Sequence, residues 1–247
     1  TKQSGNSIFR ELYAILYNNL ERKGRENMTL EWLAHSCFCL ANEEGHRLLI
    51  DPYRGEDTGY KEPQLDKVDV VICSHGHMDH ANTAVIQNPD YMKIDKAGHF
   101  ETKGFAIDTV PTYHDDENGT KRGENLVSIV ETDGLRFCHC GDLGHVLGKE
   151  QVKALGKIDV LMIPVGGLFT IDAKQAAEVV EALDVKIVIP MHYKTEACRY
   201  DLAPVEDFLE EMKKSEYAIS MYHDSVMHLD GYTIPKRAKV YVMESKY

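Results

Sequence analysis

The sequence has no apolar run that approaches the ~20 consecutive residues a helix needs to cross a bilayer. Residues 1–30 also lack the central apolar segment of a secretory signal peptide. We therefore expect no membrane partner and a cytoplasmic location. Thr1 stands first in place of Met, which leaves open whether the native N-terminus precedes it.

Basic residues are also scarce. Lysine and arginine number 28 against 40 aspartates and glutamates, which gives a formal net charge of −12. No dense lysine or arginine run is present, although binding to a phosphate backbone requires clustered basic residues. The composition thus argues against a nucleic-acid partner. Bound cations could instead offset part of the excess negative charge.

The six cysteines lack the spacing of a zinc knuckle. Two pairs, Cys37 with Cys39 and Cys138 with Cys140, fall in strand-like runs, where residues two apart point to one face. We interpret them as small buried hydrophobic side chains in a reducing compartment. A zinc site built from these four thiolates is the disfavoured alternative.

The pattern of apolar residues predicts two parts of unequal size. Residues 7–23 show the spacing of an amphipathic helix that ends before Gly24. This helix defines an N-terminal helical extension, residues 1–28, and a candidate interface for a homo-oligomer. The remaining residues, 29–247, are enough for one packed core without disulfides.

Residues 29–247 alternate short strand-like runs with a few helices. Strands are predicted at 29–34, 36–41, 46–50, 68–73, 91–94, 99–102, 104–110, 125–132, 134–140, 158–163, 185–190, 217–230 and 238–243. Helices are predicted at 149–155, 172–183 and 204–214. Strands followed by helices, twice over, favour an α/β fold with two packed sheets and helices outside, a four-layer αβ/βα sandwich. Periodicity alone leaves other mixed folds open.

One short segment concentrates metal-binding side chains. The predicted buried strand at 68–73 runs directly into His75-Gly-His77-Met-Asp79-His80. Imidazole and carboxylate are good ligands for zinc and similar divalent ions. His75 and His77 project to one side of an extended chain, and Gly76 helps the backbone turn before the next pair. The segment therefore predicts half of a site for two adjacent ions.

Further ligand types follow later strand-like runs. His114, Asp142 and His192 each stand at the end of a largely apolar run. Side chains at the carboxyl ends of strands converge at one edge of a sheet, where ligand sites are common. Alone, each could be a turn aspartate or a loop histidine. Their shared placement favours a single site.

These motifs resemble the metallo-β-lactamase superfamily. The resemblance covers residues 29 to about 230 and is carried by Asp51, the His75–His80 segment, His114, Asp142 and His192. The phrases around Leu33–Phe38, Leu49–Tyr53, Gly141–His145, Pro164–Thr170 and Ile189–Tyr193 are similar to the branch of ascorbate-6-phosphate lactonase-like metal-dependent hydrolases. The motifs are specific for superfamily and fold, and less so for substrate.

The resemblance implies a role for each residue. His75, His77 and His114 would hold one ion, Asp79, His80 and His192 the other, and Asp142 would bridge both. Asp51 would fix a ligand by hydrogen bonds. His35 and His145 would line the cleft, or else serve as hydrogen-bonded structural residues. The other histidines, at 46, 99, 139, 223 and 228, are interpreted as structural.

Two adjacent metal ions imply a hydrolytic mechanism. A hydroxide bridging the two ions would act as the nucleophile, while the ions polarise the substrate and stabilise the developing charge. Asp142 and Asp79 would be the catalytic carboxylates, the latter passing a proton to the leaving group. Zinc is the expected metal, with manganese, iron and nickel left open. Lys194, Lys121 and Arg122 could bind an anionic substrate, or could be ordinary surface charges.

Other branches fit the sequence less well. Diiron redox members typically carry Glu at the position of His77 and add a flavin domain. RNA-processing members add a basic arm or insert, and β-lactamases have a longer stretch than the 34 positions from His80 to His114. We therefore expect hydrolysis of a small lactone or ester. A phosphodiesterase is the second choice, and a metal-binding protein without turnover stays open.

Overall fold

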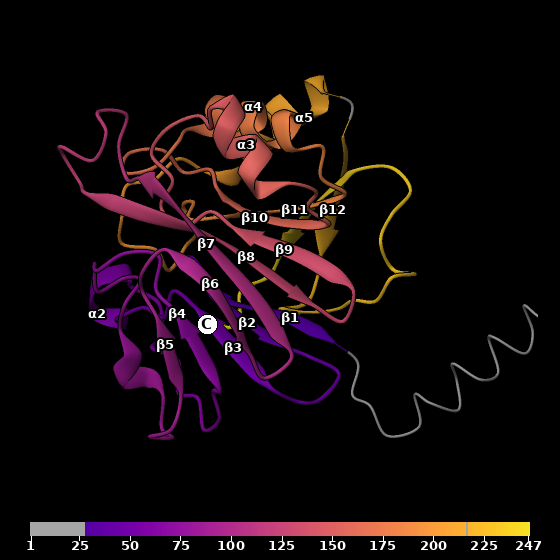
Figure 1. Cartoon of the computed structure of the whole chain (residues 1–247). Helices are drawn as coiled ribbons and strands as arrows, with labels where there is room; N and C mark the ends of the chain where they lie inside the picture. Colours follow the sequence, from indigo (N-terminus) through magenta and orange to yellow (C-terminus); the bar gives the residue numbers. More distant parts are fainter. Residues whose placement is uncertain (1–27, 216) are drawn as a thin grey trace, which may run out of the picture.

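The computed structural model describes residues 28–215 and 217–247, which form two stacked β-sheets (Figure 1). The smaller sheet has six strands in the order β13-β1-β2-β3-β4-β5. Their bounds are β1 Thr29–Ala34, β2 Cys37–Ala41, β3 Arg47–Ile50, β4 Val70–Ile72, β5 Met92–Ile94 and β13 Val226–His228.

The larger sheet has eight strands in the order β12-β14-β11-β10-β9-β8-β7-β6. Their bounds are β6 Gly98–Thr102, β7 Phe105–Tyr113, β8 Glu124–Thr132, β9 Leu135–His139, β10 Val160–Pro164, β11 Ile187–Met191, β12 Ala218–Tyr222 and β14 Lys239–Met243. β9, β10 and β11 pair in parallel, and β7 runs in the same direction because it lies two antiparallel steps from β9.

Alternation along the strands of the smaller sheet supplies two cores. In β2, Phe38 and Leu40 belong to the large central core, whereas Cys37 and Cys39 belong to a smaller core on the outer face. Successive side chains point to opposite faces of a strand, so one strand serves both cores. Cys138 and Cys140 lie in the central core, which places the two cysteine pairs apart and excludes a zinc site shared by all four.

Three helices cover the outer face of the larger sheet (Figure 1): α3 Lys149–Leu155, α4 Ala173–Leu183 and α5 Val205–Lys214. As expected for a capping box, Asp172 accepts a hydrogen bond from the backbone N–H of Gln175, whose side chain bonds back to the backbone of Asp172. α4 buries Val179, Val180 and other apolar side chains against the sheet. Pro204 is the N-cap of α5 and lies just before its first turn.

The outer face of the smaller sheet carries a thinner layer. Its regular elements are α2 (Gly55–Thr58) and the 3-10 turn η1 (Thr83–Val85), neither of which was predicted. Loop residues such as Tyr53, Tyr60 and Leu202 fill the rest of this layer. The molecule is therefore the predicted four-layer α/β sandwich, with loops replacing long helices on one side.

The predicted strands and helices of residues 29–243 are confirmed to within three residues at each end, with one exception. The run at 217–230 forms two strands, β12 and β13, that belong to different sheets. Polar residues His223, Asp224 and Ser225 interrupt the run between them. The predicted helix at 7–23 lies outside the described residues. Within the described part of the chain, no helix combines the length and apolarity that a membrane span needs.

Candidate metal centre

The predicted ligands meet where strands of both sheets end. The segment 74–80 follows β4, His114 follows β7, Asp142 comes shortly after β9, and His192 follows β11. Because β7, β9 and β11 run in the same direction, their carboxyl ends share one edge of the larger sheet. The segment after β4 meets them there, since His75 and His80 lie beside Asp142. The smaller sheet thus supplies the histidine segment and the larger sheet supplies the later ligands.

Asp142 lies at the middle of the centre. Its Oδ1 is 3.2 Å from Nε2 of His80, and its Oδ2 is 3.2 Å from Nε2 of His114 and 3.5 Å from Nε2 of His192. Asp142 is 2% exposed. A buried carboxylate with imidazoles on both oxygens is suitably placed to bridge two cations.

Two groups of imidazoles flank Asp142. His75, His77 and His114 offer ligand atoms that all lie within 4.8 Å of one another, as do His35, His80 and His192. A third such group joins His75 and His80 to Asp142. The structure thus brings together the three histidines expected on the first ion. In the second group it places His35 where Asp79 was expected.

Asp79 lies at the edge of this second group. Its Oδ2 is 3.9 Å from Nε2 of His80 and 3.7 Å from Nε2 of His35. The same oxygen accepts a hydrogen bond of 3.1 Å from the hydroxyl of Tyr200. Asp79 therefore faces both the imidazoles and a phenol.

Asp51 fixes the histidine segment through hydrogen bonds. Fully buried, it accepts hydrogen bonds from the backbone N–H of Ser74 to Oδ1 and from the Ser74 hydroxyl to Oδ2, both at 2.7 Å. Its Oδ2 also lies 2.9 Å from Nδ1 of His80, which leaves Nε2 of that ring facing Asp142. A carboxylate behind a ligating histidine fixes the ring and its tautomer.

Burial and opposite charges set the protonation of the centre. Burial, with the charge of His80 beside it, lowers the pKa of His75 to about 3, and burial lowers that of His192 to about 3. Burial disfavours charge on His80, but Asp142 and Asp51 together outweigh it and raise its pKa. Burial also opposes ionisation of Asp142, but the imidazoles around it hold its pKa far below the usual range.

Many polar atoms of the centre have no hydrogen-bond partner among the described residues. These buried atoms are His35 Nδ1 and Nε2, His75 Nε2, His80 Nε2, His114 Nδ1, Asp142 Oδ1, and His192 Nδ1 and Nε2. A buried polar atom left unpaired costs about 1–3 kcal/mol. Neutral imidazole and ionised carboxylate are the forms that bind divalent ions. The residues therefore fit a metal centre, with ions as the missing partners.

A cavity of about 310 Å³ opens onto the centre. Its lining includes His77, Asp79, His114 and Asp142 together with Lys121, Arg122, Phe169 and Tyr200. The guanidinium of Arg122 lies 5.5 Å from the ring centroid of Phe169, and that ring packs edge-on against Tyr200. The mouth thus combines two cations with an aromatic wall.

Several residues of the centre were not singled out in the sequence. Asp115 accepts four backbone N–H groups of residues 117, 119, 121 and 122, and so shapes the loop that carries Lys121 and Arg122. Burial opposes its charge, but the N–H donors outweigh it and lower its pKa to about 2. The sequence signal was its place beside His114 in a turn-rich stretch. Tyr200 and Phe169 had no comparable signal.

The loop before Asp142 is held by Asn125, which the sequence did not single out, and by His139. Oδ1 of Asn125 accepts the backbone N–H of Asp142 at 2.9 Å. Nδ1 of His139 accepts the N–H of Gly141 at 3.1 Å, so its Nε2–H donates to the carbonyl of Ser36 at 2.8 Å. His139 was interpreted as structural, and it links the β1–β2 turn to the Asp142 loop.

The remaining candidates lie away from the ligand atoms. His145 is half-buried at the rim, where its Nε2 accepts the backbone N–H of Tyr113 at 3.4 Å. The ammonium of Lys194 donates to the carbonyls of Cys198 and Tyr200 at 2.9 and 2.7 Å. Neither residue is among those lining the cavity at the centre. Lys194 instead holds the loop on which Tyr200 lies.

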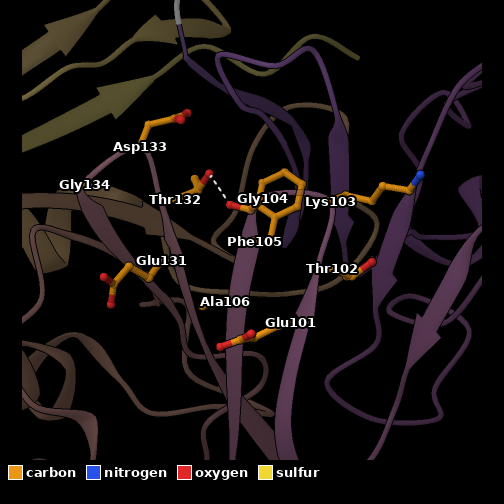
Figure 2. Close-up of a pocket in the computed structure, with 10 residues that line it drawn as sticks. All are labelled: Glu101, Thr102, Lys103, Gly104, Phe105, Ala106, Glu131, Thr132, Asp133 and Gly134. Atoms are coloured by element: carbon orange, nitrogen blue, oxygen red, sulfur yellow. Dashed lines mark hydrogen bonds between the residues drawn. The ribbon is translucent and has the colours of Figure 1, made fainter.

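A second cavity, of about 410 Å³, lies at the opposite end of β7 and contains no metal-binding histidine (Figure 2). It is lined by residues 101–106 and 131–134, around the turns β6–β7 and β8–β9. β7 is nine residues long, and a strand rises about 3.3 Å per residue. This second cavity is therefore far from the ligands, whereas the cavity of about 310 Å³ is lined by four of them.

Comparison with known proteins agrees with this geometry. The family model described as "Beta-lactamase superfamily domain" matches residues 29–192, which include all the predicted ligands. The chain belongs to the metallo-β-lactamase superfamily. Its two-sheet sandwich and its histidine segment at the sheet edge are thus features of a superfamily member.

Proteins named as metal-dependent hydrolases or as superfamily members are similar to most of the chain. A metal-dependent hydrolase of Thermococcus onnurineus is 30% identical over 75% of this chain and 90% of its own length. One from Thermoplasma acidophilum is 28% identical over 69% and 85%. A superfamily protein of Thermotoga maritima with a solved structure is 37% identical, has a TM-score of 0.72, and matches 89% of this chain and 100% of its own.

Proposed function

We propose that this protein is a metal-dependent hydrolase that holds two divalent ions, with zinc first among the candidates. The observation that carries the proposal is the set of unpaired, buried imidazole nitrogens around the ionised Asp142. The names of the Thermococcus and Thermoplasma relatives support it. The donor set of nitrogen and oxygen without thiolate suits zinc and leaves manganese, iron and nickel as alternatives.

Ions bound there would make a water acidic near neutral pH and polarise the bond to be cleaved. The chain's own residues supply the rest. Asp142 is ionised because of the imidazoles around it, and it contacts histidines of both proposed ion sites. Asp79 accepts a proton from the attacking water and passes it to the leaving oxygen, while the hydroxyl of Tyr200 keeps its carboxylate oriented.

We propose a small anionic lactone or ester as the substrate. A volume of about 310 Å³ is at the lower end for ligand pockets, which run from about 300 to 1,000 Å³. Lys121 and Arg122 are cations at the mouth of a protein whose net charge is −12. Lys121 is partly neutralised by Glu117, at 2.7 Å, so Arg122 is the stronger candidate for holding the anionic group.

The test begins with metal-free protein loaded with zinc, manganese, iron or nickel, followed by measurement of bound metal and hydrolysis. Paired substrates would include lactones and carboxylic esters with and without a carboxylate or phosphate group, and bis(p-nitrophenyl) phosphate. Faster hydrolysis of the anionic lactones or esters supports the proposal. Faster hydrolysis of the phosphodiester would instead show that the protein is a phosphodiesterase. Two bound ions without any turnover would contradict the enzyme assignment.

Two variants make the test specific. His75→Ala removes a ligand, so metal content and turnover should both fall; full retention of both contradicts the assigned centre. Arg122→Gln should raise KM for an anionic lactone roughly 10- to 100-fold, since a hydrogen bond to a charged group contributes about 1.5–3 kcal/mol. KM for the neutral analogue, the matched control, should stay unchanged.

A further inference from the structure

His35 is a buried histidine whose Nε2 lies 3.7 Å from Oδ2 of Asp79. It is 1% exposed, and neither ring nitrogen has a hydrogen-bond partner among the described residues. A structural histidine in a core donates from one nitrogen and accepts at the other, as His139 does nearby. Leaving both nitrogens of His35 without a hydrogen bond destabilises the fold, because buried polar atoms lose their bonds to water.

The backbone of His35 is also unfavourable for its residue type. It lies in the two-residue turn between β1 and β2 with φ +54°, a region that glycine enters easily and other residues rarely do. Such a conformation is strained in residues other than glycine, and strained residues tend to cluster at functional sites. Glycine at this position would avoid both the unpaired ring nitrogens and the backbone strain. The presence of histidine therefore indicates that its imidazole has a function.

Hydrogen bonds hold the turn against the metal centre. The carbonyl oxygen of His35 accepts the indole N–H of Trp32 at 3.1 Å and the backbone N–H of His192 at 3.4 Å. The rings of His35 and His192 consequently lie with centroids 4.2 Å apart. The backbone thus places two imidazoles next to each other, although they come from different sheets.

The neighbours of His35 are metal-binding groups. Its ligand atom lies within 4.8 Å of those of His80 and His192, and its Nε2 is 3.7 Å from Oδ2 of Asp79. Donor atoms around one zinc ion lie roughly 3–4 Å apart, because each is about 2.0–2.2 Å from the ion. The three imidazoles are therefore close enough for their donor atoms to converge on one ion with small movements.

We propose that His35 is a protein ligand of the second ion, together with His80 and His192. This inference rests on the proposed two-ion centre and adds a third imidazole to the half expected to contain Asp79, His80 and His192. A nitrogen-rich half favours zinc, cobalt and nickel over manganese. Asp79 then stands beside that ion with its carboxylate hydrogen-bonded to Tyr200 at the cavity wall.

Cobalt-loaded protein gives a direct readout. Metal-free wild type, His35→Gly and His35→Asn would be titrated with Co²⁺, and proton NMR would detect the strongly shifted ring N–H signals of ligating imidazoles. We expect both variants to lack one such signal. Their affinity for the second ion should fall more than about 100-fold, beyond the 10- to 100-fold typical of losing a residue that only orients a ligand.

Stability provides a second readout that does not depend on turnover. Glycine and asparagine both tolerate a positive φ, so without metal the two variants should unfold at the same or a higher temperature than wild type. With saturating Co²⁺ the order should reverse. The control is His99→Ala, which removes an exposed imidazole hydrogen-bonded to Asp108 and should change neither readout.

Retention of every shifted signal in His35→Gly would overturn the proposal, as would a wild type that binds a single ion at His75, His77 and His114. A smaller loss of affinity with all signals retained would make His35 a positioning residue. The proposed function fails separately: if two ions bind, His35 supplies one signal, and nothing is hydrolysed, the ligand assignment stands while the hydrolase assignment falls.

Discussion

At the scale of single residues, the centre depends on a few side chains whose partners come from distant parts of the chain. Tyr200 is the clearest example, since its hydroxyl donates to Asp79, which lies 121 positions earlier. Asp51 likewise forms a hydrogen bond with Nδ1 of His80, which lies 29 positions later. Such contacts determine which way a ligand or a catalytic carboxylate points.

Tyr200→Phe removes the hydroxyl and little else. A hydrogen bond to a charged group contributes about 1.5–3 kcal/mol, so kcat should fall roughly 10- to 100-fold while both ions stay bound. Turnover and metal content of the purified variant are the measurements. Tyr222→Phe, whose hydroxyl donates to the carbonyl of Val226, is the matched control and should be unchanged. Loss of an ion from Tyr200→Phe would show that the phenol supports the ligands instead.

The protonation of the histidines predicts how stability of the metal-free protein varies with pH. His75 and His192 stay neutral in the fold down to a pKa of about 3, but take up protons near pH 6.5 when unfolded. The unfolded state therefore binds more protons between these values. The free energy of unfolding should fall as pH drops below 6.5, by roughly 1 kcal/mol per pH unit for each proton.

His80 has the opposite effect at higher pH. Its raised pKa contributes stability that is fully present below pH 6.5 and is lost as pH rises through the folded value. Denaturant titration of metal-free protein should thus find maximal stability near neutral pH. The metal-loaded protein should lack the decline above it, because a ligating His80 carries no proton on Nε2. Stability that rises steadily from pH 5 to 9 without metal would contradict this.

At the scale of elements, the site depends on loops that approach one another closely. Gly144 donates its N–H to the carbonyl of Tyr113 at 2.9 Å. A Cβ atom there would contact the backbone of His114 and Asp115 too closely for any side-chain movement to relieve. The loop after Asp142 and the end of β7 therefore come together only because residue 144 has no side chain.

Gly144→Ala should separate these two elements. Overpacking against backbone costs typically 1–3 kcal/mol, and the displacement moves His114 relative to Asp142. We expect a lower free energy of unfolding and weaker metal binding, measured by denaturant titration and chelator competition. Gly231→Ala, where nothing lies within 4 Å of the added methyl group, is the matched control. Normal metal affinity in Gly144→Ala would contradict the close approach.

Prediction from sequence was good for the elements and weaker for their connections. The strands and the three longer helices follow from apolar periodicity, and the cap at Asp172 from its side chain. α2 and η1 were missed because four- and three-residue helices are too short to show a period. The split between β12 and β13 was missed because periodicity does not reveal that a strand changes sheets.

At the scale of the whole molecule, the residues of the candidate metal centre come from both sheets. His75, His77 and His80 follow the smaller sheet, whereas His114, Asp142 and His192 follow the larger one. Ions bound between them would therefore add a link between elements that also meet through the apolar core and through hydrogen bonds such as that of His139 with Ser36. Ligands that bind only the folded state raise its stability in proportion to their affinity and concentration.

Metal removal should accordingly lower the unfolding temperature. At a free-ion concentration 1,000 times Kd the stabilisation is about 4 kcal/mol for one site, and for chains of this size each kcal/mol corresponds to roughly 2–4 °C. Thermal unfolding with and without a chelator measures the shift, which restored zinc should reverse. Asp142→Asn should melt at one temperature under both conditions. An unfolding temperature of wild type indifferent to chelator would argue against bound ions linking the sheets.

The sequence by itself determined most residues of the candidate metal centre, because four of them lie within six positions and the others end apolar runs. It also determined the sheets, because burial imposes a period of two on a strand. Only the tertiary structure decided that His35 stands beside His192, that Tyr200 meets Asp79, and that Arg122 but not Lys194 lines the cavity. The reason is physical: periodicity reports which face of an element is buried, whereas a site consists of contacts between loops whose approach depends on the packing of both sheets.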